Sequence, residues 1–226
     1  MSKIILLHGA IGASDQLTPL SDSLKKAGFE TFTFNFSGHG KIPFQNDFGI
    51  IQFANELRNF IERNKLQGAT IFGYSMGGYV ALYLAAQNKD LIGNIITLGT
   101  KLNWDPEGAQ KEIKMLDPKT ILAKVPKFAE ALKARHGNDW ELLMKRTAEM
   151  MIDLGNNNLL NVSSFSKIEN KVLMGLADGD NMVTVAETDN AASQIKNAKR
   201  FTLQNTKHPI ETVNPGELTQ VLAEAR

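Results

Sequence analysis

The amino-acid sequence predicts an α/β fold: a mostly parallel sheet with helices on both faces, interrupted by a helical insertion. Short apolar segments alternate with segments of helical periodicity over the first hundred residues and again near the end of the chain. Strands separated by helices of this length indicate parallel strand–helix–strand units. Between these regions the pattern is helical. We therefore divide the chain into a first core part (1–100), a helical insertion (101–165) and a second core part (166–226).

Six segments have the patterns expected of strands. The first is continuously apolar from Ile4 to Leu7, which is typical of a strand buried on both faces. The second alternates phenylalanine with threonine or asparagine, which is the period of a strand with two different faces. The six segments are 3–7, 31–36, 69–72, 95–98, 171–176 and 200–203.

Helix boundaries are marked by capping residues and prolines. We expect one helix to begin at Thr18, as its N-cap, with proline in the next position, and to end near Gly28. The last helix is expected to begin at Asn214, with Glu217 at capping-box spacing. Other segments of helical spacing are 53–61, 76–87 and 187–195, and prolines 106, 118 and 126 divide the insertion.

Composition excludes several classes of function. The 226 residues include 25 Lys+Arg and 24 Asp+Glu, so no basic excess favours a nucleic-acid partner. The absence of cysteine excludes disulfides, thiol catalysis and thiolate metal sites. No metal-ligand cluster is visible, and we expect no cofactor. The apolar run near the start is too short for a signal peptide, and nothing approaches a membrane span, so we expect a cytoplasmic protein without a membrane partner.

The candidate nucleophile lies in the motif Gly73-Tyr74-Ser75-Met76-Gly77, which follows a predicted strand and precedes a predicted helix. The G-x-S-x-G spacing in this setting is typical of a serine nucleophile on a sharp, strained turn. The flanking glycines allow the strand and helix to approach closely. We predict that Ser75 is the nucleophile and that the Met76 N–H stabilises an oxyanion at the helix N-terminus.

The candidate general base is one of four histidines. His208 lies in a loop between the last predicted strand and the last helix. Loops at the carboxyl ends of parallel strands meet at the same edge of the sheet as the nucleophile. We therefore predict that His208 is the base. We expect His8 and His39 to shape their loops, and His136 to lie at the surface or in the packing of the insertion.

An orienting carboxylate should follow the strand at 171–176, because the chain order in this type of site is Ser, then Asp or Glu, then His. Asp178 and Asp180 both meet this requirement, whereas Glu187 falls in a predicted helix. Asp178 is only two residues beyond the predicted strand end, a position where aspartate often bonds to its own turn. Gly179 then lets the chain bend so that Asp180 can face the histidine loop.

Four segments together resemble the α/β-hydrolase superfamily, in its short, cap-bearing, esterase-like branch. The chain is similar to that superfamily over its whole length and in the same order. The resemblance implies an α/β-hydrolase sheet of six strands, with the insertion 101–165 as a cap over the active site. Asn35 stands where the family usually has Asp, which affects loop packing more than chemistry. The segments are 8–12, 35–40, 73–78 and 180–183 with 208–211.

The resemblance also implies site residues. The loop after the first strand supplies a second oxyanion-hole N–H in this superfamily, which by position is that of Ala10. Similar hydrolases place the triad Asp three residues before a Val, which favours Asp180 with Val183; counting from the strand-end glycine favours Asp178 instead. Large apolar residues of the cap are expected to pack its own core or to line an adaptable acyl pocket. The predicted substrate-binding residues are Trp104, Phe128, Trp140 and Met144.

These residues predict a serine hydrolase that cleaves a small carboxylic ester or a related acyl bond. Ser75 attacks the carbonyl, His208 transfers the proton, and Asp180 orients the imidazole. The expected partner is a small-molecule acyl substrate. One alternative is another reaction on the same triad, by a carbon–carbon hydrolase, lyase or perhydrolase. A second alternative is a ligand-binding protein with a vestigial triad. The sequence indicates neither the acyl length nor the oligomeric state.

Overall fold

The protein is built on one six-stranded sheet with the strand order β2-β1-β3-β4-β5-β6. The structure, a computed structural model, describes residues 1–225. Every neighbouring pair of these strands is parallel, so the predicted α/β sheet is confirmed and is fully rather than mostly parallel. The strands are β1 Ser2–Leu7, β2 Phe29–Thr33, β3 Thr70–Tyr74, β4 Ile95–Leu98, β5 Val172–Gly179 and β6 Ala198–Lys207.

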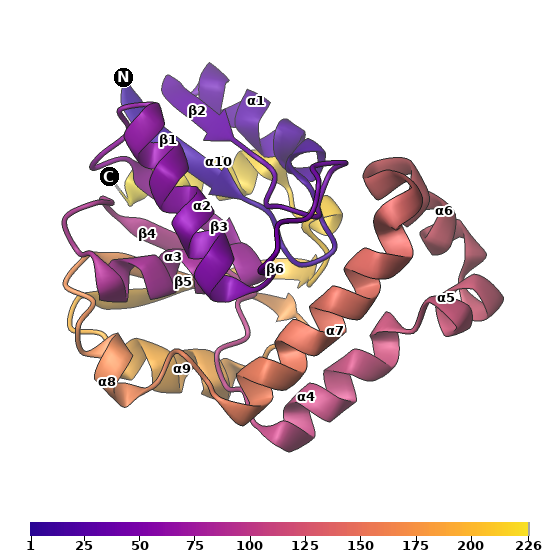
Figure 1. The fold of residues 1–226 in the computed structure, drawn as a ribbon. Helices are drawn as coiled ribbons and strands as arrows, with labels where there is room; N and C mark the ends of the chain where they lie inside the picture. Colours follow the sequence, from indigo (N-terminus) through magenta and orange to yellow (C-terminus); the bar gives the residue numbers. More distant parts are fainter. Residues whose placement is uncertain (226) are drawn as a thin grey trace.

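Helices cover both faces of the sheet (Figure 1). On one face, apolar residues of α1 and α10 pack with Ile4, Leu6, Phe72 and Ile96 of the strands. On the other face, α2, α3, α8 and α9 enclose a larger apolar core. These helices are α1 Thr18–Lys26, α2 Ile50–Arg63, α3 Met76–Gln87, α8 Val162–Phe165, α9 Val185–Ser193 and α10 Pro215–Glu224.

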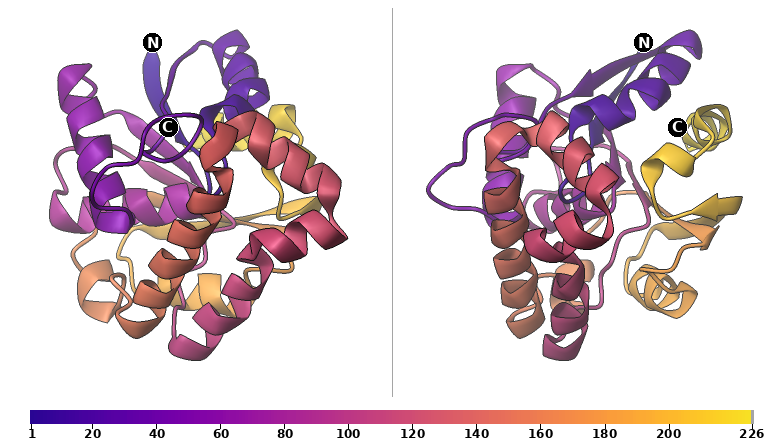
Figure 2. Two further views of the ribbon diagram at one scale, coloured as in Figure 1. Left: turned by 45° about the vertical axis from the view of Figure 1, so that its right-hand side comes forward. Right: turned by 90° about the vertical axis from the view of Figure 1, so that its right-hand side faces the viewer.

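Between β4 and β5 the chain forms a helical segment that stands apart from the sheet. Its helices lie beside the core as a separate layer, with α4 packed along α7 (Figures 1 and 2). Each of the three prolines in this segment occupies the first position of a helix, where its missing N–H costs nothing. The helices are α4 Pro106–Ile113, α5 Pro118–Lys124, α6 Pro126–His136 and α7 Trp140–Asn156.

The helical segment has a small core of its own. Six buried residues form it, and Ile11, in the loop after β1, packs against it from the sheet domain. The segment therefore rests on the loop that follows the first strand, at the carboxyl-terminal edge of the sheet. We call residues 101–156, up to the end of α7, the cap, because α8 packs against α3 and the sheet core instead. The six core residues are Leu116, Ile121, Ala129, Leu132, Trp140 and Met144.

Some predicted boundaries are wrong, for identifiable reasons. The second strand ends at Thr33, and Phe36 lies beyond it, fully buried among aromatic rings. Thr18 is not an N-cap, because the 3₁₀ helix Ser14–Leu17 leads directly into α1 and Thr18 is already helical. The other cap prediction holds in part: the Asn214 side chain accepts hydrogen bonds from the first amides of α10.

Candidate active site

Ser75 stands on a sharp turn between β3 and α3. Its backbone has φ 50° and ψ −118°, a strained conformation for a residue with a side chain. A Cβ at Gly73 would lie 2.4 Å from the Gly78 nitrogen, and one at Gly77 would lie 2.6 Å from the Leu7 carbonyl oxygen. Only glycine fits these contacts, so the flanking glycines are what allow the strand and helix to meet at this turn.

The backbone of Ser75 is fixed to the end of β4. Its N–H donates to the Leu98 carbonyl at 2.9 Å, and its carbonyl accepts from the Thr100 hydroxyl at 3.0 Å. The Gly78 N–H donates to the same carbonyl at 3.0 Å. The neighbouring strand and the first turn of α3 therefore hold the half-buried serine in place from both sides.

The loop after β1 passes directly beside Ser75. A Cβ at Gly9 would lie 3.2 Å from the Ser75 Cβ. Ala10, Ser75 and Met76 line the same small cavity, of about 40 Å³. Met76 is the first residue of α3, where amides have no partner within the helix and the dipole favours negative charge. Both residues predicted for the oxyanion hole thus border the cavity at the serine.

His208 and Asp180 form a hydrogen-bonded pair at the same edge of the sheet. Each follows directly on the end of its strand, and the strand ends Gly179 and Lys207 are paired in register. The His208 Nδ1 lies 2.7 Å from the Asp180 Oδ2, and the Asp180 side chain is only 1% exposed. Its other oxygen accepts from the Val183 N–H at 2.9 Å.

Two opposing effects set the pKa of Asp180. Burial raises the pKa of this carboxyl. The hydrogen bonds from His208 and from the Met182 and Val183 amides stabilise the charged form and outweigh burial, so the pKa lies below its ordinary value. Asp180 is therefore a carboxylate near neutral pH, as an acceptor for the imidazole N–H requires.

Asp178 has a different position and different partners. Its carboxylate is exposed and accepts from the Asn205 N–H at 2.9 Å and the Thr206 N–H at 3.0 Å. These backbone hydrogen bonds lower the pKa of Asp178 and fasten β5 to β6. Of the two aspartates that the sequence left open, it is Asp180 that contacts His208.

Tyr74 and Gly99 complete the surroundings of His208. The Tyr74 hydroxyl donates to the His208 carbonyl at 3.0 Å. Gly99 has φ 60°, and a Cβ there would lie 3.1 Å from the His208 Nδ1 and 3.2 Å from the Asp180 Oδ2. The end of β4 therefore contacts the Ser75 turn on one side and the His208–Asp180 pair on the other. The sequence analysis did not single out Gly99, although a glycine directly after a buried strand was its visible signal.

His8 and His39 support neighbouring loops from buried positions. The His8 Nε2 accepts from the Phe36 N–H at 3.2 Å, so its Nδ1 is the donor to the Gly9 carbonyl at 2.8 Å. Burial lowers the pKa of His8 to about 4. His39 donates to the Ser37 carbonyl at 3.0 Å, and burial lowers its pKa well below the ordinary value.

His136, expected at the surface or in the packing of the insertion, is instead buried between the cap and two core loops. Its Nδ1 accepts from the Gly40 N–H at 3.0 Å, and its Nε2 donates to the Ile11 carbonyl at 2.8 Å. The preceding residue, Arg135, reaches Asp15 at 3.5 Å and Glu211 at 3.7 Å. The end of α6 thus joins the cap to the loop beside Ser75 and to the loop that follows His208.

The predicted substrate-binding residues are only partly brought to Ser75. Trp104 lines the cavity, but Phe128 is 41% exposed on α6, and Trp140 and Met144 are buried in the cap's own core. The last three do not line the cavity beside Ser75, because their helical faces turn toward the cap interior or solvent. Six other residues complete the cavity wall: Ile50, Tyr79, Lys101, Met150, Met151 and Leu154.

Lys101 is a charged residue on this wall that the sequence analysis missed. Its Nζ lies 3.8 Å from a Glu112 oxygen, 4.0 Å from a Glu187 oxygen and 5.7 Å from the Trp104 ring centre. The other Glu187 oxygen accepts from the Leu102 N–H at 2.6 Å. Glu187 therefore anchors the first residues of the cap to α9.

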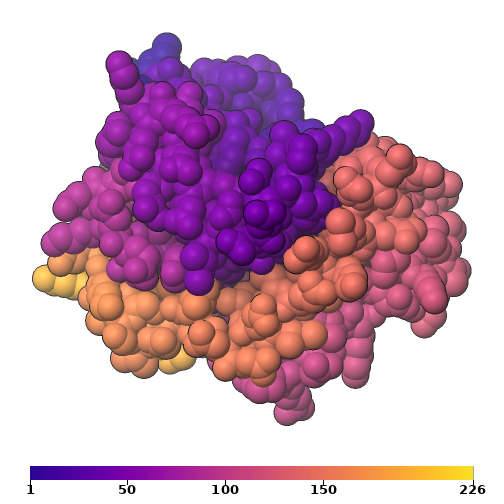
Figure 3. Space-filling view, in the orientation of Figure 1, coloured from indigo at the N-terminus to yellow at the C-terminus, as the bar shows by residue number. Residues whose placement is uncertain are grey.

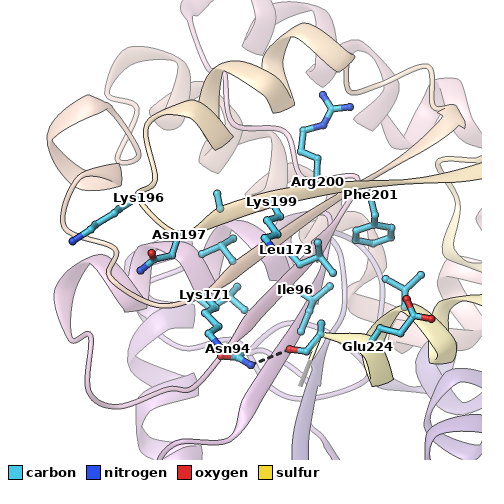
Figure 4. A pocket seen from close by; sticks show the side chains of 15 residues that line it. Asn94, Ile96, Lys171, Leu173, Lys196, Asn197, Lys199, Arg200, Phe201 and Glu224 are labelled. Atoms are coloured by element: carbon cyan, nitrogen blue, oxygen red, sulfur yellow. Dashed lines mark hydrogen bonds between the residues drawn. The ribbon is translucent and has the colours of Figure 1, made fainter.

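A second cavity lies at the opposite end of the strands. It has a volume of about 670 Å³ and is bordered by the amino-terminal ends of β4, β5 and β6 and by α10 (Figure 4). Ile96, Leu173 and Phe201 form its apolar part, and none of its lining residues is a predicted site residue. This cavity is therefore separate from the site at Ser75.

Two further features concern metals and membranes. Within residues 1–225, no cluster of three or more His, Asp or Glu side chains has the arrangement of a metal site. Within the same residues, every helix is too short or too polar to cross a bilayer.

The family of the chain is shown by comparison with known proteins. The sequence model for the α/β hydrolase fold matches residues 3–158, which is more than half of the chain. The chain belongs to the α/β-hydrolase family. The solved structure of a thermophilic esterase from Thermogutta terrifontis has a TM-score of 0.78 to this hydrolase. The superposition covers 99% of this chain and 89% of the esterase, at 17% sequence identity. At this level of identity the similarity shows a shared fold and nothing further.

Curated relatives match a part of this hydrolase. The sn-1-specific diacylglycerol lipase ABHD11 of Mus musculus is 25% identical over 96 residues, which are 42% of this chain and 31% of the lipase. The pimeloyl-[acyl-carrier protein] methyl ester esterase of Neisseria meningitidis serogroup B (strain H44/76) is 32% identical over 95 residues, 42% of this chain and 35% of the esterase. The matched segments thus span about a third of the length of these relatives.

Proposed function

We propose that this α/β-hydrolase cleaves a carboxylic ester, or a related acyl bond, through a Ser75–His208–Asp180 triad and an acyl-enzyme. The observation that carries the proposal is the arrangement at one sheet edge: a serine held at φ 50° and bonded to the end of β4, where Gly99 lies against the hydrogen-bonded His208–Asp180 pair. A strained serine at a helix N-terminus, at the same sheet edge as a histidine oriented by a buried carboxylate, provides the parts of an acyl-transfer site.

In the proposed reaction, the Ser75 Oγ attacks the substrate carbonyl carbon while the His208 Nε2 accepts the hydroxyl proton. Asp180 accepts the Nδ1–H of His208, fixes its tautomer and stabilises the imidazolium that forms. The carbonyl oxygen becomes an oxyanion that the Ala10 and Met76 N–H groups stabilise. His208 then protonates the leaving alcohol, and the acyl–Ser75 ester remains. Water, deprotonated by His208, hydrolyses that ester and releases the acid.

Ester hydrolysis is favoured over the other reactions of such a triad by two points. Relatives that match part of the chain are a diacylglycerol lipase and a methyl ester esterase, and both names describe ester hydrolysis. The wall of the cavity beside Ser75 is mostly apolar, which suits the acyl part of an ester.

The test is labelling by a fluorophosphonate probe, followed by turnover of matched ester, thioester and β-diketone substrates. The wild-type protein should be labelled at Ser75 and should hydrolyse aryl esters faster than the diketone; the Ser75→Ala protein is the control. A folded wild-type protein that is not labelled would contradict the triad and favour a ligand-binding role. Labelling at Ser75 with turnover confined to the diketone would favour carbon–carbon cleavage.

A further inference from the structure

The cavity beside Ser75 is too small for most acyl groups. Its volume of about 40 Å³ compares with roughly 30 Å³ for the share of one water molecule in the liquid. Pockets for small-molecule ligands usually have volumes of about 300–1,000 Å³. Space for anything beyond a very short acyl group must therefore be found next to this cavity.

A groove of about 600 Å³ lies on the other side of one wall of the cavity. It runs between the start of α2, with the loop before it, and the second half of α7. In the space-filling view, the violet segment near residue 50 meets the orange segment near residue 155 along this boundary (Figure 3). Ile50, Met150 and Leu154 line both the cavity and the groove. These three side chains are therefore the partition between them.

Met150 is the most adaptable part of this partition. Ile50 is β-branched and stiff at χ1, whereas methionine is unbranched and has three rotatable bonds. The Met150 Cγ lies 3.6 Å from the position of a Cβ at Gly49, so it packs over the start of α2 without wedging against it. Rotation of the Met150 side chain is the smallest movement that would join the cavity to the groove.

The groove has an apolar floor and a polar rim without positive charge. Phe48, Leu159 and the three partition residues provide apolar surface. Asp47, Asp153 and four amide side chains provide the rim, and no Lys, Arg or His is among the lining residues. Such a surface favours an aliphatic chain with an uncharged end and repels a carboxylate or phosphate. The four amides belong to Gln52, Asn55, Asn156 and Asn157.

We propose that this groove is the acyl subsite, reached past Met150, and that it takes unbranched acyl chains of about four to eight carbons with uncharged ends. The inference rests on the proposed function of Ser75. Each buried CH₂ contributes about 0.8 kcal/mol, which corresponds to roughly a fourfold gain in kcat/KM. A higher kcat/KM for long than for short acyl chains is therefore the property that tests whether the groove binds the acyl group.

The experiment measures kcat/KM for p-nitrophenyl acetate, butyrate, hexanoate and octanoate. The wild-type ratio of hexanoate to acetate should exceed ten. Asn55→Trp, which fills the groove from α2, should lower that ratio at least tenfold, and Met150→Ala should raise it. Met115→Ala is the matched control, because Met115 is 75% exposed in the cap and lies at neither cavity. The p-nitrophenyl monoester of adipic acid, a six-carbon chain that ends in a carboxylate, should have a lower kcat/KM than the hexanoate. Asp153→Asn should reduce the difference between these two kcat/KM values, because it removes a negative charge from the rim.

The outcomes separate the two proposals. Ser75-dependent hydrolysis of acetate with no gain from longer chains, or equal losses on acetate and hexanoate in Asn55→Trp, would overturn the groove and leave the triad in place. Binding to the Ser75→Ala protein, measured by calorimetry, tests the groove without turnover. There, p-nitrophenyl hexanoate should bind at least tenfold more tightly than the acetate, and Asn55→Trp should remove that difference. Equal affinities would overturn the groove even if the protein cleaves no ester.

Discussion

The core and the cap contribute to the same site but are held in different ways. In the core, Ser75 is fixed by backbone hydrogen bonds to β4 and by glycine contacts that a single extra carbon would block. The cap is joined to the core by side chains: His136 at one end, and Lys101 with Glu187 at the other. Backbone geometry is set by short sequence motifs, whereas these side-chain contacts join residues far apart in the chain.

This difference suggests that the core carries the proposed reaction and that the cap influences which substrate is preferred. The proposed reacting groups directly follow strand ends, where the sheet fixes the positions of their backbone atoms. The walls that an acyl chain would meet come mainly from α7 and α2, and they move relative to each other if the cap shifts. We therefore expect core substitutions to abolish turnover, and cap substitutions to change its rate or its substrate preference.

The largest expected effect is that of Ser75→Ala or His208→Ala. Either change removes a group that takes part in bond making or proton transfer, so kcat should fall by about three or more powers of ten. Turnover of an aryl ester measures this, with far-UV circular dichroism and thermal unfolding as controls for the fold. A folded Ser75→Ala protein that retains a tenth of wild-type turnover would exclude Ser75 as the nucleophile.

The paired variants Asp180→Asn and Asp178→Asn should differ strongly. An amide at position 180 can stabilise the wrong tautomer of His208, and we expect a loss of about 10²–10⁴ in kcat. An amide at position 178 weakens only the exposed contacts to Asn205 and Thr206, so kcat should stay within about threefold. The kcat values of the two variants, measured under the same conditions, test whether Asp180 orients His208. Equal losses of kcat in both variants would contradict that assignment.

The parts of the site that local sequence determines could be predicted. The helix at 76–87 and the strand at 95–98 have the predicted bounds, because a glycine-bounded apolar helix and a short apolar strand leave few alternatives. The serine turn depends on glycines within three residues of Ser75. The geometry of the two aspartates required the register between β5 and β6, which no local pattern contains.

The walls of the site could not be predicted, because α7 is apolar on more than one face. Met144 and Met151 are seven residues apart, so they lie on the same face and contact the cap's core. Met150 precedes Met151 by one residue and turns toward α2 instead. Sequence periodicity identifies these faces but does not say which neighbour each one meets. Trp140, at the start of the same helix, packs in the cap's core and does not line the cavity at Ser75.

A smaller effect is expected when the cap is loosened from the core. His136→Ala removes two hydrogen bonds, and one of them holds the Ile11 carbonyl next to Ala10, a proposed oxyanion donor. We expect kcat to fall about tenfold, with a smaller change in KM, because the displaced N–H would stabilise an oxyanion that forms only in the transition state. His136→Gln, which keeps a donor and an acceptor, should restore part of the loss.

Phe128→Ala is the matched control for that loss. Phe128 is exposed on the same helix, α6, and lies away from the cavity at Ser75. Its removal should change kcat less than twofold. Equal losses in the His136 and Phe128 variants would mean that the cap acts only through its overall stability, and that the contact to Ile11 has no separate role.

The smallest expected effect is on stability rather than on turnover at neutral pH. Burial lowers the pKa of His8 to about 4 in the folded protein, whereas an unfolded histidine titrates near 6.5. The unfolded chain therefore binds more protons between these values, and the free energy of unfolding decreases as the pH falls through 6.5 toward 4. From pH 7.5 to pH 5 the His8 contribution should decrease by about 2 kcal/mol. His39 and His136, whose pKa values are also lowered by burial, act in the same direction.

Urea unfolding at pH 7.5 and pH 5 measures this loss. Between pH 5 and pH 7.5 the histidines change their charge in the unfolded chain, whereas Asp178 and Asp180 do not. The pKa values of these two aspartates are lowered, so both carboxylates stay charged in the folded protein at pH 5. His8→Asn should be less stable than wild type at pH 7.5, because it loses the contacts to Phe36 and Gly9. It should nevertheless lose less on acidification, because the titrating group is gone. An unfolding free energy that is the same at both pH values in the wild-type protein would mean that the buried histidines become protonated without opening the loops they support. Protonated His136 would then remain buried between the cap and the core, although burial lowers its pKa.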